Sequence, residues 1–171
     1  MRLLFLNCLC LMACRRLPTE AELAACSRAQ LERELSGPIQ LRGSAIENGR
    51  LKPGTYVFST TYLALRVDAS GQQRFNEVSG PIQRRLDTQP GLLAYTALVA
   101  DSCAVARTFS VWADEASMYS FVGSEAHAAA VRDVALISRG GSVATHWRGT
   151  EADATWERAA EINAADPGPE Y

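Results

Sequence analysis

Residues 109–127, FSVWADEASMYSFVGSEAH, contain the end of one predicted strand and the start of a predicted helix. Apolar and polar side chains alternate up to Trp112, which is the period of a half-buried strand. Asp114 follows, and its carboxylate can accept hydrogen bonds from the unpaired amides of a first helical turn. The segment therefore predicts a strand that leads into one helix over 115–137, whose core-facing stripe is Met118, Phe121, Val122, Ala126, Ala129, Ala130, Val134 and Ile137.

The flanking sequence predicts the remaining elements of a small α+β domain. The predicted elements are a strand at 55–67, a turn at 68–73, a helix with a kink or a late start at Gly80-Pro81, a hairpin of strands 91–99 and 106–112, a strand at 142–148 and a closing helix at 154–162. Together with the 115–137 helix, the order is βαββαβ plus one helix. This is the order of the ferredoxin-like split βαβ fold.

Length and composition limit the classes of protein that remain. A chain of 171 residues has room for one domain and a targeting segment or tail. A net charge of −2 provides no basic surface for a phosphate backbone, so nucleic acid is not an expected partner. The sequence also has no P-loop, no GxGxxG motif and no GxSxG motif.

The amino terminus has the pattern of an export signal. One arginine precedes an apolar run over 3–13 that is too short to span a bilayer. Leu11-Met12-Ala13-Cys14 resembles the bacterial lipobox, which implies acylation of Cys14 and a cell-envelope lipoprotein whose only link to the membrane is that lipid. Two alternatives remain: an upstream extension of a cytoplasmic protein, or a plain cleaved signal.

Domain boundaries follow from this interpretation. We expect a signal peptide at 1–13, an arm and linker at 14–53, the folded domain at 54–165 and a tail at 166–171. Within the arm, Thr19 precedes Glu22 by three residues, as in a capping box, and predicts a short helix. The Gly- and Pro-containing segment 36–53 predicts a linker that holds one short edge strand.

Processing at Cys14 would leave two thiols, Cys26 and Cys103. The sequence favours free cysteines, with Cys103 packed as a small apolar residue and Cys26 on a flexible arm. A disulfide between them is the alternative. Cys8 and Cys10 lack the spacing and the second ligand pair of a structural zinc site, so no metal is expected.

The motif at 109–127 resembles a known family. A strand that ends in Trp112, the acidic cap Asp114, Met118 with an aromatic residue three positions later, and Ser124-x-x-His127 are together similar to the antibiotic biosynthesis monooxygenase superfamily of dimeric α/β barrels. The resemblance covers about 56–148. It implies a ferredoxin-like protomer that pairs sheet to sheet as a homodimer and keeps a cavity between its own sheet and helices.

The expected dimer surface is the sheet face opposite the helices. Tyr56, Phe58 and Tyr62 alternate onto one face of the first strand and predict an apolar surface that a second copy covers. We therefore expect a homodimer.

The resemblance also implies a chemistry that needs no cofactor. Family members of this kind deprotonate a substrate whose carbanion then reduces oxygen, so the protein supplies a base, a hydrogen-bond donor and an apolar pocket. The residues that match are Trp112 as donor and His127 as catalytic base. The expected ligand-binding residues are Tyr62, Tyr95, His146 and Arg148. Haem degradation in the family uses an asparagine on the first strand, which is absent here.

Two functions follow from the sequence. The first is a cofactor-independent monooxygenase that acts on a small aromatic or quinone-type ligand. The second is a non-catalytic, lipid-anchored envelope protein that binds a small apolar ligand. Proximity of Trp112 and His127 in one pocket would favour the enzyme, and export would favour the binding protein.

Overall fold

The computed structural model describes residues 18–26, 39–100 and 103–165. The elements are α1 (Glu20–Ala25), β1 (Ile46–Glu47), β2 (Arg50–Leu51), β3 (Thr55–Ala64), α3 (Ala69–Asp87), β4 (Leu92–Ala100), β5 (Val105–Trp112), α4 (Glu115–Val122), α5 (Glu125–Arg132), α6 (Val134–Ile137), β6 (Val143–Thr150), the 3₁₀ turn η2 (Glu151–Asp153) and α7 (Trp156–Ala165). None of the helices in these ranges is long and apolar enough to cross a membrane.

Strands β3 to β6 form one antiparallel sheet in the order β4-β5-β3-β6. With α3 between β3 and β4 and with α4 to α6 between β5 and β6, this is the ferredoxin-like α+β fold that the sequence predicts. The hairpin of β4 and β5 is confirmed, as is the fourth strand. Strands β3 and β5 are the two central strands, paired over eight residues from Val57–Trp112 to Ala64–Val105.

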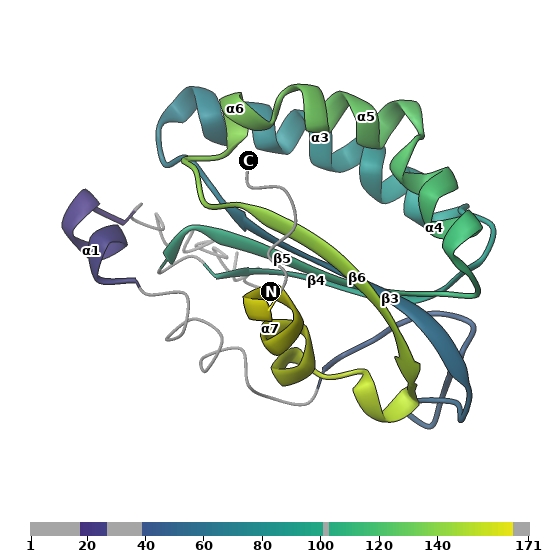
Figure 1. Ribbon diagram of the computed structural model, residues 1–171. Helices are drawn as coiled ribbons and strands as arrows, with labels where there is room; N and C mark the ends of the chain where they lie inside the picture. The colour runs from purple at the N-terminus through teal and green to yellow at the C-terminus, as the bar shows by residue number, and fades with distance from the viewer. Residues whose placement is uncertain (1–17, 27–38, 101–102, 166–171) are drawn as a thin grey trace, which may run out of the picture.

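Helices α3 to α6 cover one face of this sheet (Figure 1). Helix α3 begins at Ala69, because Asp68 caps it by accepting a 2.9 Å hydrogen bond from the amide of Gly71. The predicted turn at 68–73 is therefore wrong. Pro81 lies inside a continuous helix that begins twelve positions earlier, so the alternative of a late start is also wrong.

The second predicted helix, 115–137, is divided into three. Asp114 caps α4 as predicted and accepts a 2.7 Å hydrogen bond from the amide of Ser117. Helix α4 ends at Val122 with Gly123 as its C-cap, and Ser124 then caps a new helix by accepting a 3.4 Å hydrogen bond from the amide of His127. The Ser-x-x-His motif is thus a helix start, with the histidine in the first turn of α5.

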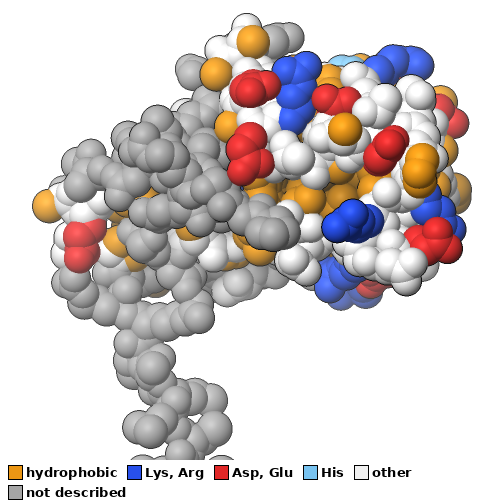
Figure 2. All heavy atoms as spheres, turned by 90° about the horizontal axis from the view of Figure 1, so that it is seen from below, with side chains coloured by type: hydrophobic (Ala, Val, Ile, Leu, Met, Phe, Trp, Pro, Cys, Tyr) orange, Lys and Arg blue, Asp and Glu red, His pale blue; other side chains and the backbone are white. Residues whose placement is uncertain are grey.

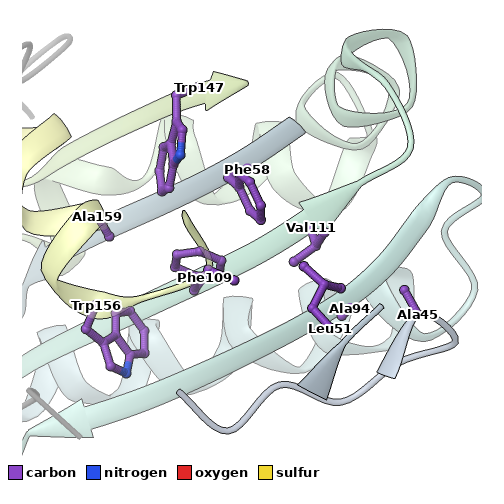
Figure 3. Close-up of a cluster of buried hydrophobic side chains, with 10 residues drawn as sticks. Ala45, Leu51, Phe58, Ala94, Phe109, Val111, Trp147, Trp156 and Ala159 are labelled. Carbon is purple, nitrogen blue, oxygen red and sulfur yellow. The ribbon is translucent and has the colours of Figure 1, made fainter. Parts of the chain in front are cut away.

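The other face of the sheet is covered by the same chain. Helix α7 and the β1–β2 hairpin lie below the sheet and bury a cluster of aromatic and aliphatic side chains (Figure 3). Phe109 is fully buried there, with ring centroids 5.6 Å from Phe58, 5.6 Å from Trp147 and 5.8 Å from Trp156. Seen from this side, hydrophobic side chains gather near the middle of the face and charged ones surround them (Figure 2).

The expectation of an uncovered aromatic face is therefore wrong. Phe58 is 0% exposed and Tyr62 is 8% exposed within the single chain, because α7 and residues N-terminal to β3 pack on them or beside them. Tyr56 packs against the same cluster and is half-buried. The homodimer itself stays a prediction, but covering these three side chains is no longer a reason for it.

Part of the expected linker belongs to the folded domain. Arg42 pairs with Tyr95 on the edge of β4 through backbone hydrogen bonds of 3.0 and 2.9 Å, which confirms one short edge segment. Gly43 follows, and a side-chain carbon there would lie 2.2 Å from the carbonyl oxygen of Leu93. Because this close backbone contact requires glycine, the domain begins before residue 54 and not after the segment.

The arm is also attached covalently. The capping box at Thr19 is present, and α1 ends at Cys26. Cys26 forms a disulfide with Cys103, 77 positions further along the chain. The favoured expectation of two free thiols is wrong, because α1 lies beside the end of the sheet, where its Leu23 packs against a cluster of sheet and helix side chains that includes Leu65 and Ile137.

Candidate functional site

Four hydroxyl side chains lie in the centre of the sheet face that the helices cover. They are Ser59 and Thr61 on β3 and Thr108 and Ser110 on β5. Strands β3 and β5 have a neighbouring strand on each side, so solvent reaches their side chains only from the faces of the sheet. All four hydroxyl side chains are half-buried, so solvent is not fully excluded from them. These hydroxyl groups are therefore partly accessible between the helices and the sheet. We call these four residues and the neighbouring Trp112, Phe121 and His127 the interlayer site.

Two separate apolar clusters border the hydroxyl groups. On one side Val57, Trp112, Met118 and Phe121 pack together with side chains of α3. On the other side Leu65, Val78, Ala106 and Ile137 form a second cluster. The helices thus contact the sheet at both ends of the face and leave the polar strip between them.

The hydroxyl groups form two cross-strand pairs. Ser59 and Ser110 are directly opposite each other, with their Oγ atoms 2.7 Å apart, and Thr61 and Thr108 have Oγ1 atoms 2.6 Å apart. Trp112 is 1% exposed, and its Nε1–H points to the first pair, 3.1 Å from Ser59 Oγ and 3.0 Å from Ser110 Oγ. The indole N–H is therefore engaged within the protein.

Phe121 connects Trp112 with His127. Its ring centroid lies 5.5 Å from that of Trp112 and 5.1 Å from that of His127. His127 Nδ1 lies 3.1 Å from the carbonyl oxygen of Val122, which only accepts, so Nδ1 carries the proton and Nε2 keeps a lone pair. Burial lowers the pKa of His127, and the hydrogen bond to Val122 opposes this only in part. The histidine is thus a neutral base near neutral pH.

This lowered pKa predicts a pH dependence of stability. In the unfolded chain the histidine has its ordinary pKa of about 6.5, so between that value and the lower folded pKa the unfolded state binds more protons. The contribution of His127 to stability is therefore complete above about pH 6.5 and is lost as the pH falls below it. We expect His127→Gln to reduce the decrease in stability between about pH 7 and 5 in urea unfolding. Parallel curves for the variant and the wild type would contradict a neutral, half-buried imidazole.

The two residues expected on the fourth strand lie on the helix-facing side, as alternation predicts. His146 pairs in register with Ser59, and its Nε2 lies 3.4 Å from the hydroxyl of Tyr119 on α4. Arg148 Nε donates a 2.9 Å bond to Glu115, which lowers the pKa of that carboxyl. His146 is exposed at the rim of the interlayer site, and Arg148 is engaged in an exposed ion pair.

The two expected tyrosines lie on opposite faces. Tyr95 is in register with Ser110 on the helix-facing side, but its hydroxyl donates a 2.9 Å bond to Asp87 on α3 and accepts one of 3.1 Å from Arg42. It lines an open cavity of about 800 Å³ at the edge of β4. Tyr62 lies on the face below the sheet, where Arg107 stacks over its ring, so it does not join the site.

The serine and threonine pairs were missed in the sequence. The signal was present, because Ser59, Thr61, Thr108 and Ser110 alternate onto one face of two strands between apolar ends. Recognising them required the register that places the two strands side by side. Over residues 18–26, 39–100 and 103–165 no cluster of His, Cys, Asp and Glu is arranged to hold a metal ion.

The structure is a ferredoxin-like α+β domain with paired, half-buried hydroxyl groups on the helix-facing side of its sheet. Residues 60–133 match the family model for antibiotic biosynthesis monooxygenase. This part of the chain is therefore similar to the antibiotic biosynthesis monooxygenase family, in agreement with the resemblance of the 109–127 motif.

Solved structures are similar to the chain at low sequence identity. A protein from Mycobacterium tuberculosis is 10% identical, with a TM-score of 0.48 over 54% of this chain and 92% of that one. A structure described as an antibiotic biosynthesis monooxygenase is 12% identical, with a TM-score of 0.47 over 53% and 95%. A protein of unknown function from Nitrosomonas europaea is 16% identical, with a TM-score of 0.44 over 56% and 88%. No curated protein matches the sequence.

Proposed function

We propose that the interlayer site binds a small aromatic or quinone-type molecule and that the protein is a cofactor-independent monooxygenase. The observation that carries the proposal is the group of half-buried hydroxyl side chains beside Trp112, with the neutral His127 packed on the neighbouring Phe121. Aromatic walls suit a flat apolar ligand, and the hydroxyl groups suit a polar atom on it. The family match supports oxidoreductase chemistry.

In this proposal His127 acts as the base. Its Nε2 takes a proton from an acidic C–H of the ligand, and the resulting carbanion passes one electron to O₂. Recombination of the two radicals forms a C–O bond, and loss of water from the hydroperoxide leaves a carbonyl group. The net change is CH₂ plus O₂ to C=O plus H₂O, with carbon oxidised and oxygen reduced.

Oxygen uptake with anthrone as the substrate tests this proposal. We expect His127→Gln to lower kcat/KM by about 10- to 100-fold, because general-base catalysis typically contributes at least that much. The glutamine amide can still donate to the Val122 carbonyl, so the helix start should be preserved. Arg132→Gln, exposed at the end of the same helix, is the matched control and should be unchanged. No uptake above the spontaneous rate by the wild-type protein would reject the enzyme.

A second candidate is favoured by the Cys26–Cys103 disulfide. Structural disulfides persist in oxidising compartments, which fits an exported protein. In this case we propose that the chain is a lipid-anchored envelope protein, acylated on Cys14. It binds a small apolar ligand in the interlayer site and does not catalyse a reaction. Mass spectrometry of the mature amino terminus tests this, because an intact Met1 contradicts export and an acylated Cys14 supports it.

A further inference from the structure

The interlayer site has three groups that could donate a hydrogen bond to a ligand: the indole N–H of Trp112 and the hydroxyl groups of Ser59 and Ser110. Their mutual hydrogen bonds decide which of them has a proton left for the ligand. Trp112 has one N–H, and both nearby acceptors are serine oxygens at 3.1 and 3.0 Å. Trp112 is 1% exposed, so this proton is enclosed by the protein. The indole is therefore not the group that reaches a ligand.

The serine pair has two hydroxyl protons and one bond between its members. At 2.7 Å, one serine donates to the other, and the second proton is left over. If the spare proton is on Ser110, its protein acceptor is the Ser59 carbonyl oxygen at a long 3.4 Å. If it is on Ser59, the contacts of the described residues give it no acceptor. The pair thus has one hydroxyl proton to offer.

The lone pairs of the serine that accepts are already filled. Each hydroxyl oxygen has two lone pairs, and when Ser110 donates to Ser59, the Ser59 oxygen receives that proton and the indole N–H together. Accepting two hydrogen bonds also polarises its own O–H group and strengthens it as a donor. In this arrangement a ligand group next to Ser59 has to be an acceptor and not a donor.

We infer that the Ser59–Ser110 pair is an oxygen-binding subsite, which donates one hydrogen bond to a carbonyl or phenolate oxygen of the ligand, and that Trp112 is a positioning residue for this donor. The inference rests on the proposed ligand site and names the substrate class that this site takes. It selects aromatic ketones, quinones and phenolates over hydrocarbons of the same shape.

Two probes of equal skeleton test the inference by calorimetry with the full chain. 1-Tetralone has a carbonyl oxygen, and tetralin has the same rings without it. We expect the wild-type protein to bind tetralone about five- to tenfold more tightly, the effect of one hydrogen bond. We expect each single serine-to-alanine variant to lose less than threefold, because the remaining hydroxyl still donates, and Ser59→Ala/Ser110→Ala to bind both probes equally.

Two further variants separate the donor from its surroundings. Thr60→Val removes a buried hydroxyl on the opposite face of β3 and should keep the preference for tetralone. Trp112→Phe keeps both serines but removes the N–H that orients and polarises them, so it should weaken the preference for tetralone without abolishing it. Loss of the preference in Trp112→Phe together with its retention in the serine double variant would make the indole the donor and overturn the inference.

The remaining outcomes distinguish the two proposals. If the wild-type protein binds both probes with equal affinity, the interlayer site binds ligands but the assignment of the serine pair as the oxygen-binding subsite is wrong. If it binds neither probe, the proposed ligand site fails and the serine assignment fails with it. If the double variant loses affinity for both probes equally, the serines act only in packing, which also overturns the inference.

Discussion

Trp156→Ala is expected to lower the free energy of unfolding by about 3–5 kcal/mol, the usual cost of truncating a buried aromatic side chain. Trp156 is 2% exposed, and its ring lies 5.8 Å from that of Phe109. It also packs under the guanidinium of Arg107, which is 1% exposed and 5.2 Å from the indole centroid. The variant therefore opens the lower face of the sheet at a point where an aromatic cluster and a buried cation meet.

Urea unfolding measures this effect, and Leu136→Ala is the matched control. Leu136 is 57% exposed, so its truncation should change stability by less than about 0.5 kcal/mol. Light scattering on the Trp156→Ala protein should also show increased self-association, since part of the apolar face becomes exposed. Equal urea midpoints for the variant and the wild type would show that the packing of α7 on this face does not contribute to stability.

The sequence predicted the fold well where local signals agree with tertiary packing. Alternation identified all four strands of the sheet, and Asp114 and Thr19 cap helices as predicted. The error at 115–137 has a local cause, because Ser124 offers a cap that competes with continuing the helix. The error at 68–73 has the opposite cause: Gly71 and its polar neighbours resemble a turn, but the Asp68 cap starts the helix there.

The coverage of the lower face was harder to predict. Isolated Ala45 and Leu51 give no periodic pattern, yet they pack against Ala94 and Val111 because the chain returns along the edge of β4 (Figure 3). Such contacts depend on tertiary placement, which composition does not encode. The same is true of the disulfide, since nothing in the spacing of Cys26 and Cys103 places them together.

The candidate site was predicted in part. Trp112 and His127 each contact the ring of Phe121, and their catalytic roles stay a prediction. The prediction that Tyr62 lines the ligand site is wrong, because it lies on the face opposite the helices. Alternation assigns residues to the two faces of a strand, but it does not predict which face the helices cover. The Trp112 N–H points toward serine oxygens of the protein. This direction depends on the cross-strand register, which the sequence pattern does not predict.

Breaking the Cys26–Cys103 disulfide is expected to lower the free energy of unfolding by about 2–4 kcal/mol. In the unfolded chain the bond closes a loop between residues 77 positions apart, so its loss restores conformational freedom to the unfolded state. In the folded state Arg139 donates to the carbonyl oxygens of Cys103 and Ala104 at 3.0 and 2.9 Å, and these bonds do not depend on the disulfide. The end of the sheet should therefore stay ordered while α1 is released.

Urea unfolding with and without a phosphine reductant, combined with Cys26→Ala, distinguishes the bond from the packing of its sulfur atoms. Reduction leaves both sulfur atoms in place, so reduced wild type and oxidised Cys26→Ala should unfold at similar urea concentrations, and the reductant should not affect the variant further. Limited proteolysis should then cleave near α1 in both, with the sheet intact.

Cys103 is 2% exposed, so replacing it would add the cost of a buried cavity, and Cys26 is the better residue to change. Reduced and oxidised wild type that unfold together would show that α1 is held by its apolar contacts alone, and would remove the disulfide as an argument for an oxidising compartment.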